Sequence, residues 1–273
     1  MSTVLVIFLG DVVGVAGREM FAKHATALRQ KYRADALIVN GENSSSQGRG
    51  ITPKIADFFK QHGADIITTG NHIWYRREIY NYLNEHSTIL RPANFPSGAP
   101  GVGVSVITVN GTKIAVINLQ GRVFMKEALD DPFRAIDSIL LYLRDKTPLI
   151  FIDFHAEATS EKYGLAYYCA GRVTGVVGTH THVQTADERV LPGGTAYITD
   201  LGMAGALNSM LGMQKEAIIN HFLTQLPVKF SVDTKPPFVL TGVCITADKQ
   251  TGRATEIERI RIVDEDLVVQ SEE

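Results

Sequence analysis

The N-terminal part of the chain alternates between short apolar runs and stretches with helical periodicity. The apolar runs predict strands, and they lie at residues 3–10, 35–41 and 64–72. The stretches that follow them repeat apolar residues at the spacing of a helix, at residues 16–32, 52–63 and 76–86. Because the strands are apolar throughout, this order predicts a parallel sheet that is buried on both faces.

The pattern changes after a loop rich in proline and glycine at residues 92–103. Two apolar stretches then flank Asn110-Gly111, a strong signal for a two-residue hairpin. Later segments predict a helix near 131–145, apolar strands that run into polar turns within 148–157 and 173–182, and an antiparallel pair with one solvent-facing side at 238–248 and 254–264. We therefore expect one α/β domain, residues 1–273, with a mixed sheet system whose second sheet begins at the hairpin.

Composition narrows the class of protein only a little. The chain has 273 residues, of which 45% are hydrophobic, so it can bury a core without disulfides. Its formal net charge of -2 gives no electrostatic reason to expect an extended nucleic-acid surface or a membrane as the main partner. The opening apolar run ends at Asp11 and is too short to span a bilayer. We expect Cys169 and Cys244 to be reduced core residues of a cytoplasmic protein.

Residues with metal-binding chemistry gather where the predicted strands end. Ligands of open α/β sheets bind beyond the carboxyl ends of the strands, so these positions meet at one edge. Five predicted strands end in oxygen or nitrogen donors, which are Asp11, Glu42 with Asn43, Asn71 with His72, His155, and His180 with His182. This convergence predicts a shared metal site.

Each of these residues also has an ordinary structural interpretation. Asp11 could cap the helix that follows it, and so could Asn71-His72. Glu42-Asn43 could form a solvated turn, and a lone His155 is more often a hydrogen-bonded polar group than a ligand. The pair in "THTH" (179–182) directs both imidazoles to one side only if the segment is extended. The set is much more specific than any of its members.

As an ordered set, the residues resemble the metallophosphoesterase (calcineurin-like) superfamily. Its blocks correspond here to "GD" at 10–11, "GEN" at 41–43, "GNH" at 70–72, His155 and "GTHTH" at 178–182. Two features depart from the superfamily: valine replaces the usual histidine two places after the aspartate, and Glu-Asn replaces the usual Gly-Asp. With "GENSSSQGRGIT", "LRPANFP" and "DPFRAID", these departures are similar to the bacterial YmdB-type branch of cyclic-nucleotide phosphodiesterases.

The resemblance implies a fold and a cofactor. The fold would be α/β, with two mixed β-sheets packed as a sandwich and flanked by helices in four αββα layers. The cofactor would be two divalent metal ions, Fe, Mn or Zn, bridged by Glu42. The other ligands would be Asp11, Asn43 and His182 for one ion, and Asn71, His155 and His180 for the other.

The resemblance also implies an activity. It is the hydrolysis of small cyclic nucleotides, 2′,3′-cyclic, 3′,5′-cyclic or both, by a bridging hydroxide with His72 as the proton donor. Two divalent ions, two carboxylates and one hydroxide leave a net charge of about +1, which suits a phosphodiester monoanion. Two alternatives stay open: a phosphomonoesterase or nucleotidase on the same centre, and a regulatory nucleotide-binding protein whose partner interactions matter more than turnover. The sequence also leaves a homo-oligomer possible.

Several other polar residues are expected to lie outside the centre. Structural roles at or near helices are expected for His24, His62, His86 and His221. Arg49 could meet a phosphate, but a solvated loop arginine is the favoured interpretation, and Arg49 is not included among the site residues. Met125 and the "DPF" at 131–133 could contact substrate or pack in a lid.

Overall fold

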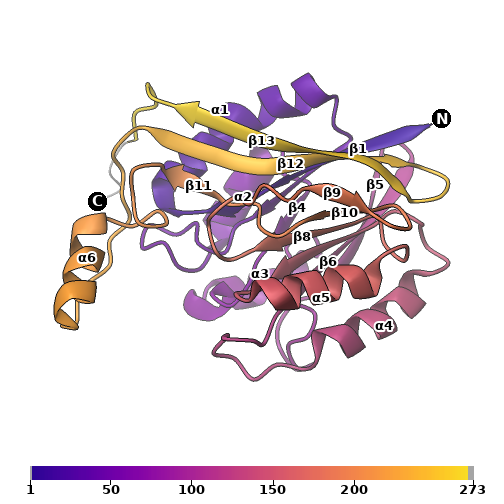
Figure 1. Ribbon diagram of the computed structural model, residues 1–273, viewed down its shortest axis with the longest axis horizontal. Helices are drawn as coiled ribbons and strands as arrows, with labels where there is room; N and C mark the ends of the chain where they lie inside the picture. Colours follow the sequence, from indigo (N-terminus) through magenta and orange to yellow (C-terminus); the bar gives the residue numbers. More distant parts are fainter. Residues whose placement is uncertain (1, 270–273) are drawn as a thin grey trace.

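The computed structural model describes residues 2–269 and has two β-sheets packed face to face, with helices on their outer faces (Figure 1). The first sheet has the spatial order β2 (Asp11–Val12), β11 (Met203–Ala206), β12 (Phe238–Asp248), β1 (Thr3–Leu9), β3 (Ala36–Asn40) and β4 (Ile66–Thr68), and β13 (Ala254–Asp264) pairs with β12. The second has the order β5 (Val104–Val109), β6 (Thr112–Gln120), β7 (Ile150–His155), β8 (Gly175–Thr179), β10 (Thr195–Ile198) and β9 (Arg189–Leu191). The helices are α1 (Gly14–Tyr32), α2 (Pro53–Gln61), the 3-10 helix η1 (Ile73–Tyr75), α3 (Ile79–Glu85), α4 (Pro132–Leu143), α5 (Thr159–Cys169) and α6 (Lys215–Thr224).

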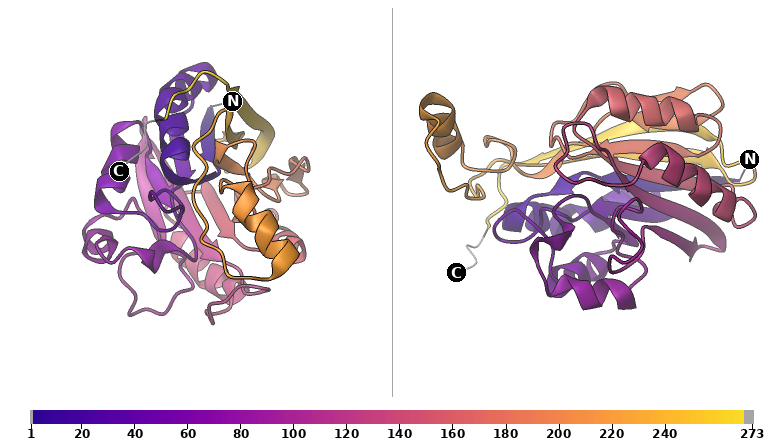
Figure 2. Two further views of the ribbon diagram at one scale, coloured as in Figure 1. Left: turned by 90° about the vertical axis from the view of Figure 1, so that its left-hand side faces the viewer. Right: turned by 90° about the horizontal axis from the view of Figure 1, so that it is seen from below.

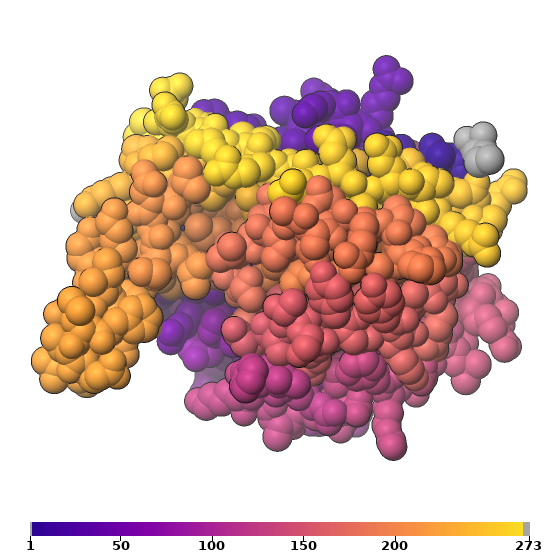
Figure 3. Space-filling model, in the orientation of Figure 1, coloured from indigo at the N-terminus to yellow at the C-terminus, as the bar shows by residue number. Residues whose placement is uncertain are grey.

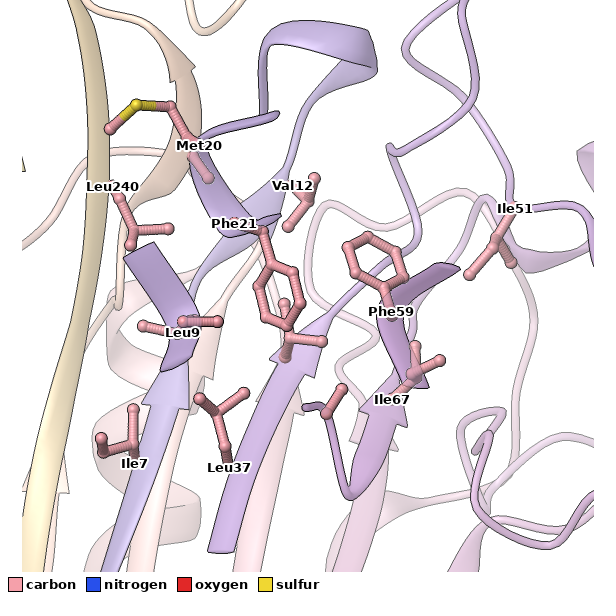
Figure 4. Close-up of a cluster of buried hydrophobic side chains, with 14 of the residues drawn as sticks. Ile7, Leu9, Val12, Met20, Phe21, Leu37, Ile51, Phe59, Ile67 and Leu240 are labelled. Carbon is pink, nitrogen blue, oxygen red and sulfur yellow. The ribbon is translucent and has the colours of Figure 1, made fainter. Parts of the chain in front are cut away.

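The apolar N-terminal strands are buried on both faces, as their sequence predicts. In β1, Ile7 and Leu9 belong to the core beneath α1 and α2, whereas Phe8 belongs to the core between the sheets. Phe21 of α1 and Phe59 of α2 meet edge-to-face above this sheet, with ring centroids 5.1 Å apart (Figure 4). The strands β1, β3 and β4 pair in parallel, which confirms the predicted parallel arrangement.

Three apolar layers hold the sandwich together. Between the sheets, Phe8 packs against Phe151 of β7 with ring centroids 5.6 Å apart. Outside the second sheet, Phe154 shares a core with Ile136 of α4 and Leu165 of α5. The expected four-layer αββα architecture is therefore confirmed, and Figure 2 shows the helical layers on either side of the two sheets.

Local signals in the sequence also form as predicted. Thr52 caps α2 by accepting a hydrogen bond from the backbone of Ile55 at 3.3 Å. The hairpin between β5 and β6 turns at Asn110 (φ 48°) and Gly111 (φ 74°), and the left-handed backbone at both positions explains the preference for this dipeptide.

The structure corrects two expectations. The helix expected over 76–86 is shorter, because η1 precedes it and α3 begins only at Ile79. The strand at 238–248 was expected to have a wet face, but β12 is almost wholly buried. It pairs with β13 along one edge and with β1 and β11 along the other, so it lies inside the sheet, and the exposed positions are on β13.

A segment that the sequence did not single out extends from the body. We call residues 207–237, which join β11 to β12, the α6 arm. Its helix α6 stands away from both sheets in Figures 1 and 2. None of the described helices is both long and apolar enough to cross a membrane. Cys169 and Cys244 are buried and free, as expected.

Candidate metal centre

All the expected ligands and His72 lie where strands of the two sheets end. In the first sheet they come directly after β1, where Asp11 opens β2, and after β3 and β4. In the second sheet His155 is the last residue of β7, and the other two histidines follow β8. The side chains of Asp11, Glu42 and His155 are at most 1% exposed, whereas those of His180 and His182 are 21% and 10% exposed. The two sheets thus bring residues more than 160 positions apart in the chain to one partly covered cluster, since His180 donates its backbone N–H to Asp11 Oδ2 at 3.1 Å over a separation of 169 positions.

One group of donors surrounds the inner nitrogen of His155. Its Nε2 lies 3.0 Å from Asn71 Oδ1, 3.0 Å from His180 Nδ1 and 3.3 Å from Glu42 Oε1. Two ligands that bind one ion at right angles, each at ~2.1 Å, lie ~3 Å apart. The donors of Glu42, His155 and His180 all lie within 4.8 Å of one another. This spacing fits a single cation held by the four side chains.

The second group contains buried oxygens that need a partner. Among the described residues, neither Asp11 Oδ1 nor Asn43 Oδ1 has a hydrogen-bond donor, although both are buried. A buried, unsatisfied oxygen costs ~1–3 kcal/mol and more when it is charged. His182 Nε2 lies 4.0 Å from Asp11 Oδ1. A cation coordinated by these residues would satisfy both oxygens, so the donor set fits the metal that the sequence resemblance implies.

Each histidine of the centre turns one nitrogen inward and occupies the other with an outer partner. The outer contacts are His155 Nδ1 with Thr179 Oγ1 at 2.9 Å, His180 Nε2 with Glu157 Oε2 at 3.1 Å, and His182 Nδ1 with Leu211 O at 3.0 Å. Such partners fix the tautomer and the ring orientation of metal-binding histidines. The inner nitrogens are therefore presented to the centre.

The two buried carboxylates of the centre, Asp11 and Glu42, are stabilised in their charged form by nearby positive charge. Burial raises the pKa of Asp11 to about 6, although His182 and His155 oppose this effect. Burial would also raise the pKa of Glu42, but the charge and hydrogen bond of His155, with the hydrogen bond of His72, hold it well below its usual value. Burial lowers the pKa of His155, yet Glu42 and Asp11 together raise it to about 9. A protonated His155 therefore partly neutralises the two buried carboxylates when no metal is bound. Metal binding would release this proton, because a histidine ligand must be neutral.

His72 lies beside the centre and reaches its carboxylate. Its Nδ1 is 2.9 Å from Glu42 Oε1, and its backbone N–H donates to Glu42 Oε2 at 3.3 Å. Its backbone dihedrals of φ -90° and ψ 0° are in the sparsely occupied bridge region, where active-site residues are often found. With Nδ1 engaged by Glu42, Nε2 is the ring atom left for substrate.

Comparison with known proteins identifies the family of the chain. The profile of a family described as YmdB-like protein matches residues 7–260. The chain belongs to the YmdB-like family. A Bacillus subtilis (strain 168) family relative named 2′,3′-cyclic-nucleotide 2′-phosphodiesterase is 50% identical over 262 residues, which are 96% of this chain and 98% of the relative. A crystal structure of a novel phosphatase from Mycoplasma pneumoniae has 36% identity and a TM-score of 0.91, covering 97% of this chain and 95% of that one.

Family membership confirms the resemblance seen in the sequence. The protein is an enzyme of the metallophosphoesterase type, and its relatives are phosphatases or phosphodiesterases. A putative 5′-nucleotidase from Staphylococcus aureus shares only 15% identity, with a TM-score of 0.65, and this likeness concerns the fold alone. The assignment of individual ligands and of His72 stays a prediction.

The His-x-His segment is a turn, as the polar residues after the apolar run predict. Strand β8 ends at Thr179, and both histidines have left-handed backbones, with φ 103° for His180 and φ 65° for His182. Such conformations are strained for residues other than glycine and persist only where the surroundings impose them. The turn, and not strand alternation, directs the two imidazoles to different parts of the centre.

A buried ion pair that no sequence motif indicates holds this turn. Asp200 Oδ2 accepts the backbone N–H of Thr181 at 3.1 Å, between the two histidines. Lys162 Nζ of α5 donates to the same oxygen at 2.7 Å, and both side chains are 1% exposed. Lys162 and Asp200 lie 38 positions apart, so no local motif reveals them.

Replacement of Lys162 by methionine is expected to lower the free energy of unfolding by ~3–5 kcal/mol, because Asp200 keeps a buried charge without its partner. Urea denaturation measures the change. Lys126→Met, which removes an exposed lysine, is the matched control and should alter stability by less than ~0.5 kcal/mol. Equal stability of Lys162→Met and the parent protein would contradict a structural role of the pair.

A second buried carboxylate supports His155 from behind. Asp153 accepts hydrogen bonds from Thr179 Oγ1 at 2.7 Å, from Asn40 Nδ2 at 3.2 Å and from the hydroxyl of Thr68. Thr179 Oγ1 in turn contacts His155 Nδ1. The sequence carried a usable signal here, since an aspartate inside the apolar run "LIFIDFH" (149–155) requires buried partners.

Gly70 allows β4 to end directly against the centre. A Cβ at this position would lie 2.2 Å from His155 Cδ2 and 2.3 Å from Glu42 Oε2. Gly70→Ala is therefore expected to displace these ligands and to weaken metal binding ~10–100-fold, the effect typical of disturbed ligand support. Metal content after dialysis against a weak chelator measures it, with Gly98→Ala as a control in open space. Normal metal content in Gly70→Ala would show that the centre tolerates the shift.

Proposed function

We propose that the protein is a metal-dependent phosphodiesterase that hydrolyses 2′,3′-cyclic nucleotides. The observation that carries the proposal is the cluster itself: inward donor atoms ~3 Å apart, two buried oxygens without donors, and a histidine beside the shared carboxylate. The name of the 50% identical relative supports the substrate class. Activity towards 3′,5′-cyclic nucleotides is also part of the proposal, and the substrate series below includes 3′,5′-cyclic AMP to test it.

The residues divide into two sets of ligands around Glu42. Asn71, His155 and His180 would hold one ion, and their mutual distances support this set. The other set is Asp11, Asn43 and His182, supported by the unsatisfied oxygens. When bound, divalent ions would activate a water molecule as the nucleophile and neutralise charge on the phosphoryl oxygens.

His72 would supply the proton that the leaving group needs. Water adds across the P–O2′ bond: its oxygen joins phosphorus, the P–O2′ bond breaks, and O2′ takes a proton from His72 Nε2. Glu42 accepts the hydrogen bond from His72 Nδ1, which orients the ring and leaves Nε2 towards the substrate. The side chain of His72 is 18% exposed, so substrate can reach it. The product would be a nucleoside 3′-phosphate. One proton of the water returns the imidazole to its starting state, and the other stays on the new phosphate group.

A phosphomonoesterase on the same centre is the second candidate. The names of the Mycoplasma relatives, a putative phosphatase/phosphodiesterase and a novel phosphatase, favour it. The donor set alone does not separate diesters from monoesters, because both present anionic oxygens to the metals.

Turnover of a matched series decides between the candidates. Protein loaded with Mn, Fe or Zn and checked by elemental analysis would be assayed with 2′,3′-cyclic AMP, 3′,5′-cyclic AMP and 3′-AMP. We expect cleavage of 2′,3′-cyclic AMP to 3′-AMP, with little further release of inorganic phosphate. We also expect EDTA to abolish this activity. Faster release of phosphate from 3′-AMP would favour the monoesterase. A fully metallated protein that binds these nucleotides without turnover would support a regulatory role instead.

A further inference from the structure

A cavity of about 640 Å³ lies beside the metal centre, between the body and the α6 arm. Its body side is formed by the loop at 46–49, by Tyr75 and by Val15 in the first turn of α1, and its arm side by Met213, residues 228–232 and Thr234. Figure 3 shows the surface hollowed between the orange arm and the purple N-terminal part. A volume of this size is typical of small-molecule sites.

The cavity adjoins His72 through a shared aromatic neighbour, Tyr75. The ring of Tyr75, which lines the cavity, packs edge-to-face on the ring of His72 with centroids 5.0 Å apart. The loop at 46–49 is tied to the centre because Asn43 Nδ2 donates to Gly48 O at 3.0 Å. A proton donor must lie on the side of the leaving oxygen, which in a cyclic nucleotide belongs to the sugar. The nucleoside should therefore extend from the metals past His72 and into this cavity.

The lining of the cavity suits a base and an anion. Tyr75 and Phe230 are 56% and 40% exposed and offer aromatic faces for stacking. Arg49 and Lys229 bring two positive charges, and no aspartate or glutamate lines the cavity within the described part of the chain. Arg49 lies over the ring of Tyr75, 5.8 Å from its centroid, and neither cation pairs with a carboxylate among residues 2–269.

The two cations exceed what a cyclic mononucleotide needs. Its single phosphate belongs at the metals, so Arg49 and Lys229 would face an uncharged ribose 5′-hydroxyl. A 5′-phosphate would match them, as arginine and lysine both bind phosphate through charge-assisted hydrogen bonds. The same charge is present on a 5′-phosphorylated mononucleotide and at the last internucleotide linkage of an RNA whose 3′ end is a 2′,3′-cyclic phosphate.

We propose that this cavity is a nucleoside subsite with a second phosphate position, so that the enzyme prefers 2′,3′-cyclic phosphates that carry a phosphate group at the 5′ position. The proposal rests on the phosphodiesterase function proposed above. The cleaved bond stays at the metals, while Arg49 and Lys229 pair with the 5′-phosphate and Tyr75 stacks on the base.

The test compares three substrates: 2′,3′-cyclic AMP, its 5′-phosphorylated form, and the dinucleotide ApA ending in a 2′,3′-cyclic phosphate. The metal-loaded protein is expected to show roughly tenfold higher kcat/KM, mainly through lower KM, for a substrate with the 5′ charge. If kcat/KM is also higher for the dinucleotide than for 2′,3′-cyclic AMP, the site is assigned to RNA ends. If it is higher only for the 5′-phosphorylated mononucleotide, the site is assigned to mononucleotides. Equal kcat/KM for all three would overturn the proposal.

Charge-neutral variants identify the residues. In Arg49→Gln/Lys229→Gln, the advantage of the 5′-phosphorylated substrates over 2′,3′-cyclic AMP should fall to about one. Lys215→Gln removes an exposed lysine of the same arm outside the cavity and should keep the full advantage. An advantage that survives in the double variant would contradict the assignment.

A binding measurement separates the subsite proposal from the proposed phosphodiesterase activity. If the metallated protein cleaves none of the three, the same nucleotides are titrated by calorimetry. Tighter binding of the 5′-phosphorylated form, lost in the double variant, would support the subsite without the activity. Equal binding of the phosphorylated and unphosphorylated forms would reject it.

Discussion

Replacement of His72 by alanine is expected to lower kcat on 2′,3′-cyclic AMP by ~10²–10⁴-fold, the contribution typical of a positioned proton donor. Its Nδ1 already contacts Glu42 Oε1, so its role is set by the proton that Nε2 can give and not by metal binding. Metal content should therefore stay at the parental level. Steady-state kinetics with elemental analysis of the same sample measures both quantities.

The choice of leaving group separates proton donation from a general loss of structure. Bis(p-nitrophenyl) phosphate has an acidic leaving group that departs without a proton, so His72→Ala should lose much less activity on it than on 2′,3′-cyclic AMP. His86→Ala is a matched control, because His86 contacts only local groups near Tyr82 at the end of α3. Near-normal turnover of the cyclic nucleotide by His72→Ala would remove His72 from the mechanism.

The candidate ligands could be predicted because strand ends converge whatever the details of packing. Asp11, Glu42 and His155 each follow an apolar run, and the runs alone place them at one edge of a sheet. The four histidines that were expected to have structural roles lie at or near helices: His24 contacts Asp264 at 2.8 Å, and the other three each donate a ring N–H to a nearby backbone carbonyl. Patterns of this kind depend on local order along the chain.

Other features could not be predicted, because they depend on contacts between residues that are far apart in the sequence. Lys162 and Asp200 look like an ordinary helical lysine and a turn aspartate, and only the packing of α5 against the His-x-His turn buries them together. The left-handed backbones of His180 and His182 belong to the turn that this packing holds, and a polar stretch after an apolar run predicts a turn but not its dihedral angles. The α6 arm escaped notice because its short apolar helix gives the same periodicity as a helix packed on a sheet.

The second large effect is expected for Glu42→Gln, which should empty the centre of metal. Glu42 is 1% exposed and provides one of the two carboxylates among the proposed ligands. An amide keeps the shape but removes the charge, and metal affinity should fall more than ~100-fold, beyond the loss typical of an outer-shell change. Elemental analysis after dialysis, with competition by a chromogenic chelator, measures the loss.

The control must separate the loss of a ligand from the loss of a buried charge. Glu161→Gln serves this purpose, because Glu161 is 8% exposed and accepts the backbone N–H groups of Arg122 and Val123 outside the centre. It should keep its metal. If Glu42 is shared by both ions, Glu42→Gln should lose metal from both sets of ligands together, whereas His182→Ala should lose mainly one. Full metal content in Glu42→Gln would show that the carboxylate serves only to orient His72, and the dinuclear arrangement would then need another bridge.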